Sequence, residues 1–418
     1  MKTKALRLYG ANDLRLEEFE LPAIKKDEIL AQVVSDSLCM SSYKAVIQGA
    51  VHKRVPNDVA QNPVIIGHEF CGRIIEVGED WKKQYRAGDK FVIQPALNYK
   101  GSIDAPGYSF NYIGGCATYI IIPPQVMHAG CLLPYKADAF FYGSLSEPVS
   151  CVIGSIKEMF HVTPGIHEHN MGLKRNGSLL IVAGAGPMGL GAIDYAVHCE
   201  NRPARIVVTD INQNRLDYAY RILPPDEAKA DGVELVYLNT CDLDDAAGYL
   251  KGLNGGRGYD DVLAMAPVKA VAELADAALG ADGCLSFFAG PTDKDFSAAV
   301  NYYNVHYNGT HIIGTVGGNS SDMLESIHMM EQGLINPAAM VTHIGGLDAS
   351  LDATLTLPDI PGGKKLIYTQ ISLELTAIAD FAQKGEKQLL FKTLAEIVGR
   401  HNGLWCTEAE EYLLDALA

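Results

Sequence analysis

The feature that most constrains this chain is a glycine-rich turn that joins an apolar run to a helical pattern. Residues 179–195 read LLIVAGAGPMGLGAIDY, and Gly184, Gly186 and Gly189 stand there in GxGxxG spacing. A buried strand followed by such a turn and a helix is typical of a βαβ unit that binds a dinucleotide. The next apolar run ends at Asp210, where a carboxylate can hold an adenosine ribose. An ordinary Gly-rich turn is the alternative, but the whole pattern favours a dinucleotide site.

Each position of the turn has a physical role. Gly184 permits the tight turn, Gly186 lets the backbone approach a pyrophosphate, and Gly189 allows the helix to pack closely on the strand. The helix start adds unpaired N–H groups and the positive end of a dipole. The predicted cofactor contacts are therefore Gly184, Gly186, Pro187, Met188 and Gly189, together with the acidic residue that follows.

Asp210 also indicates which dinucleotide binds. Its carboxylate can accept hydrogen bonds from both ribose hydroxyls, whereas a 2′-phosphate would be repelled. That repulsion is about 1 kcal/mol in water and about 4 kcal/mol at an effective dielectric near 20. The sequence favours NAD(H) over NADP(H), although Arg215 on the next helix leaves NADP(H) open.

Composition narrows the class of protein. The chain has 418 residues, 48% of them hydrophobic, and a formal net charge of −16, so we expect two domains and no nucleic-acid or anionic-membrane partner. It has no apolar run of membrane-spanning length, and its Met-Lys-Thr-Lys start lacks the apolar core of a signal peptide. Nine cysteines without CxxC spacing suit reduced thiols. We expect a cytoplasmic enzyme.

The pattern of strands and helices changes along the chain. Short strands are predicted at residues 5–9, 14–18 and 28–35, which makes the N-terminal third mostly β. After residue 147, longer alternating strands and helices predict a doubly wound α/β sheet. Its further strands are expected at residues 207–210, 235–237, 261–265, 283–289 and 311–315, with a helix at 268–279.

Two segments of the β region carry metal-ligand side chains. Cys39 lies in SLCMSSYK, and His68 and Glu69 lie in NPVIIGHEFCG. Thiolate, imidazole and carboxylate are the groups that bind Zn²⁺, and a catalytic site keeps one position open. Taken singly, each residue is as readily explained as a buried thiol or a satisfied polar pair.

In combination, these segments resemble the zinc-dependent medium-chain dehydrogenase/reductase family. The resemblance implies a GroES-like, mostly β catalytic domain beside a Rossmann domain. It implies one catalytic zinc held by Cys39 and His68, with Glu69 of GHE and Glu147 of SLSEPVSCVIG competing for the third place. Ser41 matches the hydroxyl that hydrogen-bonds the reacting alcohol. The implied domains are 1–147 (catalytic), 148–316 (NAD-binding) and 317–418 (return to the catalytic domain with a C-terminal helical extension).

The chain departs from the family pattern in two places. Residues 94–115 contain no cysteine, so we expect no structural zinc; Tyr108, Phe110 and Tyr112 could replace it by aromatic packing. In the proton path, Ser42 and Lys44 stand where the family often has Asp and His. The proton relay is therefore expected to be shorter or different.

The C-terminal tail, the SSYK variant and FFAGPTDKDFSA together resemble a bacterial sugar-phosphate reductase branch of the family. The implied reaction is hydride transfer between NAD(P)H and the ketone of a sugar phosphate, in a homo-oligomer (dimer or tetramer). Lys44 and the loop His52-Lys53-Arg54 are candidate phosphate ligands, or simply solvated cations. A dehydrogenase of unphosphorylated polyols or other secondary alcohols and a non-catalytic dinucleotide-binding protein are the alternatives.

The tail itself predicts a final helix. Thr407 and Glu410 stand in capping-box spacing before the apolar residues Tyr412, Leu413 and Leu414. We expect Glu410 to cap its own helix.

Overall fold

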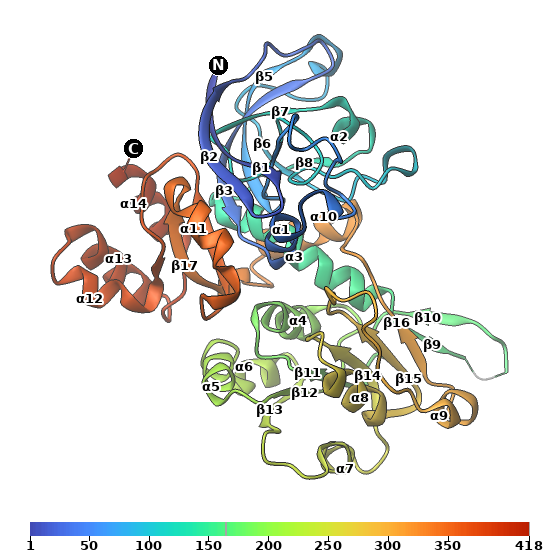
Figure 1. The fold of residues 1–418 in the computed structure, drawn as a ribbon. Helices are drawn as coiled ribbons and strands as arrows, with labels where there is room; N and C mark the ends of the chain where they lie inside the picture. Colours follow the sequence, from blue (N-terminus) through green and yellow to red (C-terminus); the bar gives the residue numbers. More distant parts are fainter. Residues whose placement is uncertain (164, 418) are drawn as a thin grey trace. The chain divides into compact units, whose positions relative to one another are not determined.

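The computed structural model describes residues 1–163 and 165–417 (Figure 1). The chain forms two compact units. Unit 1 contains Met1–Pro148, Asn319–Glu331 and the chain from Val341 onward, and unit 2 contains Val149–Gly318 and Gln332–Met340. The return of Gln332–Met340 to unit 2 was not predicted from the sequence.

Unit 2 is built on a six-stranded parallel sheet in the order β13-β12-β11-β14-β15-β16. Counted along the chain, this is the order 3-2-1-4-5-6 of the doubly wound dinucleotide-binding fold, whose strand order reverses beside the first strand. β9 (Phe160–Val162) and β10 (His169–Met171) form a separate two-stranded antiparallel sheet, and β9 contacts β15. The sheet strands are β11 (Ser178–Val182), β12 (Arg205–Asp210), β13 (Glu234–Asn239), β14 (Tyr259–Ala264), β15 (Leu279–Phe287) and β16 (His311–Ile313).

Helices connect these strands, as parallel pairing requires. The core between sheet and helices contains the fully buried Leu180, Val207, Tyr259 and Val262. The helices of unit 2 are α4 (Pro187–His198), α5 (Gln213–Ile222), α6 (Pro225–Ala230), α7 (Ala246–Leu253), α8 (Lys269–Ala278) and α9 (Tyr302–Tyr307).

Unit 1 is mostly β. Its larger sheet has eight strands, with seven in the order β19-β17-β18-β3-β5-β6-β8 and β7 paired to β3; its smaller sheet has the order β2-β1-β4. The strands are β1 (Lys2–Gly10), β2 (Asp13–Glu20), β3 (Ile29–Ser37), β4 (Val64–Ile65), β5 (Phe70–Val77), β6 (Lys90–Ile93), β7 (Tyr119–Ile122), β8 (Leu132–Pro134), β17 (Val341–Gly346), β18 (Lys364–Tyr368) and β19 (Thr376–Ala377).

Helix α3 (Phe140–Lys157) begins in unit 1 and carries Glu147 before the unit boundary at Pro148. The C-terminal helices, orange to red in Figure 1, also belong to unit 1. The other helices of this unit are α1 (Met40–Gln48), α2 (Pro124–His128), α10 (Ser320–Glu331), α11 (Ser350–Leu355), α12 (Phe381–Gly385), α13 (Leu389–Arg400) and α14 (Thr407–Leu417).

The predicted α/β class with a doubly wound parallel sheet and a mostly β part is confirmed, and the predicted strands lie within a few residues of those observed. Across the described residues, no helix has the length and apolar character needed to cross a membrane.

The predicted capping box at the C-terminus is wrong, although α14 is present. Glu410 is buried, and its two carboxylate oxygens accept hydrogen bonds from the backbone N–H groups of Phe140 and Phe141 at 2.5 and 2.9 Å. The Tyr368 hydroxyl donates a third, at 2.7 Å. Glu410 therefore caps α3, whose first N–H groups have no partner within the helix, instead of its own helix.

Candidate active site

Three predicted metal ligands meet in unit 1. The ligand atoms of Cys39, His68 and Glu69 all lie within 4.8 Å of one another. Cys39 is the extended N-cap residue of α1, and the other two directly precede β5. Gly67 lets this segment approach its neighbours: its φ is +94°, and a Cβ there would lie 2.7 Å from Asp36 Oδ2 and from the Cys116 amide nitrogen.

His68 is held by hydroxyl groups on both sides of its ring. Nδ1 lies 3.1 Å from Ser42 Oγ, and Nε2 lies 3.3 Å from both Ser41 Oγ and Tyr108 Oη. Burial, followed by the positive charges of Lys364 and Arg54, lowers the pKa of His68 to about 4, although Glu69 opposes them. The imidazole is therefore neutral near pH 7, which is the form that binds a metal.

The Cys39 sulfur lies 3.0 Å from Ser41 Oγ. Loss of hydration, and after it the charge of Glu69, raises the pKa of this thiol to about 12. A thiolate at this position therefore needs a cation beside it. A thiol, an imidazole and a carboxylate within 4.8 Å fit Zn²⁺, which holds such ligands at about 2.0 to 2.3 Å.

Glu69 is already paired within the protein. Lys364 Nζ donates to both of its oxygens at 2.6 Å, and the side chains of Glu69 and Lys364 are only 1% and 6% exposed. The Lys364 ammonium holds the pKa of Glu69 below its usual value in spite of burial. Lys364, on β18, was not identified from the sequence, because GGKKLIY shows no local sign of a partner that lies 295 residues away.

Glu147, the rival third ligand, is buried on α3 but is not part of the 4.8 Å group among the described residues. Its charge still acts on the site: after burial and Glu69, it contributes to the raised pKa of Cys39. The structure thus groups Glu69 with Cys39 and His68, and Glu147 is linked to this group through its charge on Cys39.

Tyr108 is a site residue that the sequence interpretation treated only as packing. It is 2% exposed, and its hydroxyl donates to Ser41 Oγ at 2.9 Å. Its ring centroid lies 4.9 Å from that of His68. The alternating aromatics of residues 108–112 gave no sign of this role, since Phe110 packs on the apolar core and Tyr112 is exposed.

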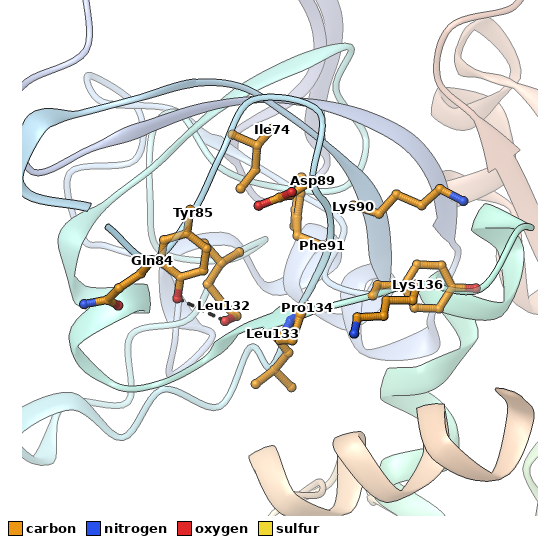
Figure 2. Close-up of a pocket in the computed structure, with 11 residues that line it drawn as sticks. Ile74, Gln84, Tyr85, Asp89, Lys90, Phe91, Leu132, Leu133, Pro134 and Lys136 are labelled. Carbon is orange, nitrogen blue, oxygen red and sulfur yellow. Dashed lines mark hydrogen bonds between the residues drawn. The ribbon is translucent and has the colours of Figure 1, made fainter. Parts of the chain in front are cut away.

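A separate pocket of about 360 Å³ lies elsewhere in unit 1 (Figure 2). Figure 2 shows Lys90 and Lys136 beside the apolar residues of β6 and β8, and Tyr85 donates to the Leu132 carbonyl at 3.3 Å. None of the metal-ligand candidates lines it, so it is distinct from the metal cluster.

In unit 2, the glycine turn joins β11 to α4, and its left-handed residue is Ala183 with a φ of +56°. Gly186 is the N-cap of α4, and Pro187 opens the helix ahead of Met188. A Cβ on Gly189 would lie 1.9 Å from the Gly184 carbonyl oxygen, so this position requires glycine. A Cβ on Gly186 would meet nothing within 4 Å, which leaves open space beside a helix N-terminus for a phosphate group.

Asp210 ends β12 next to this turn. Its Oδ2 accepts a hydrogen bond from the Ala185 N–H at 3.3 Å, and its Oδ1 accepts one from the Asn212 N–H at 3.0 Å. These bonds hold the buried carboxylate in place, and each oxygen keeps a further lone pair for a ribose hydroxyl. Arg215 is exposed on α5.

A cluster of zinc-ligand side chains in a mostly β unit and a dinucleotide turn in a parallel α/β unit define the class of zinc-dependent nicotinamide oxidoreductases. Residues 25–131 match the alcohol dehydrogenase GroES-like domain, and residues 187–332 match the zinc-binding dehydrogenase family. The chain belongs to the zinc-dependent medium-chain dehydrogenase family.

Relatives extend over almost the whole chain. The chain is 50% identical to mannitol-1-phosphate 5-dehydrogenase of Aliivibrio fischeri, over 99% of this chain and 98% of the relative. It is 48% identical to L-sorbose 1-phosphate reductase of Klebsiella pneumoniae, over 99% and 97%. Among solved structures, 2R,3R-butanediol dehydrogenase of Bacillus subtilis has a TM-score of 0.71 at 19% identity, covering 88% of this chain and 99% of that one, which shows the shared fold.

Proposed function

We propose that this protein catalyses reversible hydride transfer between NAD(H) and the ketone of a phosphorylated ketose. The observation that carries the chemistry is the Cys39, His68 and Glu69 cluster with Ser41 at its edge. The substrate class is supported by two relatives, 48% and 50% identical over 99% of the chain, whose names specify sugar or polyol phosphates.

We assign Cys39 and His68 as zinc ligands, with Glu69 and Glu147 as alternative third ligands. The Glu69 carboxylate lies within 4.8 Å of the Cys39 and His68 ligand atoms but is paired with Lys364, so it can bind the metal only as that pair loosens. Glu147 is the nearby carboxylate that can take its place. When bound, zinc supplies a Lewis acid for the carbonyl oxygen and the nicotinamide supplies the hydride.

Ser41 is placed to transfer the proton. Its Oγ is next to both Cys39 and His68, and it accepts a hydrogen bond from the Tyr108 hydroxyl. Ser41 could therefore donate a proton to the developing alkoxide, while the Tyr108 hydroxyl holds Ser41 Oγ in place by a hydrogen bond. Burial raises the pKa of Tyr108 well above its usual value, so this hydroxyl stays a neutral donor in the resting protein.

Asp210 supports NAD(H) as the preferred cofactor. A buried carboxylate beside the glycine turn can bind ribose hydroxyls, and it would repel a 2′-phosphate. The exposed Arg215 is the residue that could offset this repulsion. We expect the active form to be a homo-oligomer with a single zinc per chain.

The direct test is oxidation of NADH, and separately of NADPH, by protein of measured zinc content. L-Sorbose 1-phosphate and L-sorbose are compared as substrates, with Cys39→Ser as the inactive control. Turnover that strongly favours the phosphorylated ketose supports the proposal. Equal turnover of both ketoses assigns the protein to unphosphorylated polyols, and zinc without any turnover on either contradicts the proposed reaction.

A further inference from the structure

The segment after α1 brings basic side chains to the ring of Tyr108. His52 stacks on this ring, with centroids 5.7 Å apart and planes 10° apart, and Arg54 Cζ lies 5.4 Å from its centroid. Burial, and then the charges of Arg54, Lys53 and Lys44, lowers the pKa of His52 to about 4. His52 is therefore neutral near pH 7, and Lys53 is exposed, which leaves Arg54 as the partly buried cation of this segment.

The charged group of Arg54 is only partly satisfied by the described residues. Its buried Nε has no hydrogen-bond partner, and within residues 1–163 and 165–417 its guanidinium forms no ion pair with a carboxylate. A buried donor without an acceptor is uncommon in folded proteins.

The backbone of Arg54 is nevertheless held firmly. Ser109 Oγ donates to its carbonyl oxygen at 2.7 Å, and its own N–H points to His52 Nδ1 at 3.3 Å. These two bonds hold the backbone from which the guanidinium extends. Planar guanidinium groups bind phosphate through two parallel hydrogen bonds.

This cation is next to the reaction centre. Arg54 lies beside the ring of Tyr108, whose hydroxyl contacts Ser41 and His68 at 2.9 and 3.3 Å, and the charge of Arg54 helps to lower the pKa of His68. In a 2-ketose 1-phosphate, only C1 and the ester oxygen separate the carbonyl carbon from phosphorus. A phosphate on the neighbouring carbon therefore stays close to the reacting carbonyl, and Arg54 is a cation that contacts a side chain of the metal cluster's surroundings, Tyr108.

We propose that Arg54 binds the phosphate of the substrate and selects ketoses phosphorylated on the carbon next to the carbonyl. This inference rests on the proposed function and extends it to the position of the phosphate. Lys44, the earlier candidate from the sequence, acts at most as a supporting charge near His52.

The experiment compares Arg54→Gln and Arg54→Lys with Lys53→Gln, a matched loss of one positive charge at the exposed neighbour. The readouts are kcat and KM for L-sorbose 1-phosphate and L-sorbose, and inhibition of L-sorbose reduction by inorganic phosphate. Zinc content and thermal unfolding confirm that each variant is folded and loaded.

We compare kcat/KM for L-sorbose 1-phosphate with kcat/KM for L-sorbose. In Arg54→Gln we expect the ratio of these two values to fall about 10- to 100-fold, because a charge-assisted interaction is lost. Most of the fall should come from a higher KM for L-sorbose 1-phosphate. Inhibition by inorganic phosphate should weaken by a similar factor. Arg54→Lys should restore part of the ratio, and Lys53→Gln should change it less than threefold.

The outcomes separate the two proposals. If the wild-type protein does not prefer the phosphorylated ketose, the proposed function fails. If it does and Arg54→Gln keeps that preference, the function stands and the role of Arg54 is overturned.

The position of the phosphate is tested with D-fructose 6-phosphate, which carries it far from the carbonyl. Wild-type inactivity on this ketose, or a smaller loss in Arg54→Gln than with L-sorbose 1-phosphate, supports the placement. An equal or larger loss contradicts it.

Discussion

Replacing Lys364 by methionine should strongly destabilise the protein in the absence of zinc. Lys364 Nζ donates to both oxygens of Glu69 at 2.6 Å, and both side chains are almost fully buried. Methionine has a similar length but no charge, so Lys364→Met leaves the carboxylate buried without its cation. Breaking a buried pair in this way costs about 3 to 5 kcal/mol of unfolding free energy.

Removing both charges should cost much less. In the double variant Glu69→Gln with Lys364→Met no buried charge is left, and neutral replacement of a buried pair is often close to neutral in stability. We expect it to be more stable than Lys364→Met alone by at least about 2 kcal/mol. Lys384→Met is the control, because Lys384 pairs with the exposed Glu374 and such a pair contributes about 0 to 1 kcal/mol.

The assay is urea unfolding with and without saturating zinc. It compares the wild type, Lys364→Met, Glu69→Gln, the double variant and the Lys384→Met control. If Glu69 binds zinc when released from Lys364, the metal should reduce the cost of Lys364→Met. A cost below about 1 kcal/mol for Lys364→Met in zinc-free protein, equal to that of the surface control, would refute the reasoning. It would mean that the pair is solvated or that Glu69 is neutral.

Three other perturbations have defined outcomes. Burial raises the pKa of Glu410 to about 7. The folded state therefore keeps the Glu410 proton to a higher pH than the unfolded state does. As the pH rises from about 4.5 to 7, this difference should lower the unfolding free energy of the wild type by up to about 3 kcal/mol. Glu410→Gln should remove that slope in urea unfolding at pH 5 and pH 8, and an unchanged slope would assign it to another group. Asp210→Ala should raise the KM for NADH about tenfold and that for NADPH much less in steady-state kinetics; a parallel rise would argue against ribose binding. Cys39→Ser should lower the zinc bound after dialysis and the turnover together, whereas full zinc occupancy would remove Cys39 from the ligand set.

Several features were predictable because they depend on residues close together in the chain. The βαβ turn needs glycines at fixed spacing, since a Cβ at Gly189 would meet the Gly184 carbonyl. The two ligands of the GHE segment are adjacent, and Ser41 follows Cys39 by two positions. A resemblance based on such short motifs was enough to name three side chains that the structure brings within 4.8 Å.

Other features could not be read from local patterns. Tyr108 is aromatic in a run where alternate aromatics also serve ordinary packing, so nothing local distinguished a hydroxyl aimed at Ser41. In the sequence, His52, Lys53 and Arg54 were equally plausible phosphate ligands. The structure distinguishes them by burial and by contact with Tyr108. His52 stacks on the Tyr108 ring and is neutral, Lys53 is exposed, and Arg54 lies beside the ring with an unpartnered Nε.

By itself, the sequence determined the alternation of β and α/β regions, the dinucleotide turn and the identity of the candidate zinc ligands. The first two follow from periodicity and from spacing within one turn or strand, and the third follows from the resemblance of the Cys39 and GHE segments to a known family. The tertiary structure alone decided the long-range pairs: Lys364 meets Glu69 across 295 residues, and Glu410 caps α3 across 270 residues. The physical reason is that a buried charge must find a partner wherever the fold brings one, and this requirement leaves no trace in the neighbouring residues.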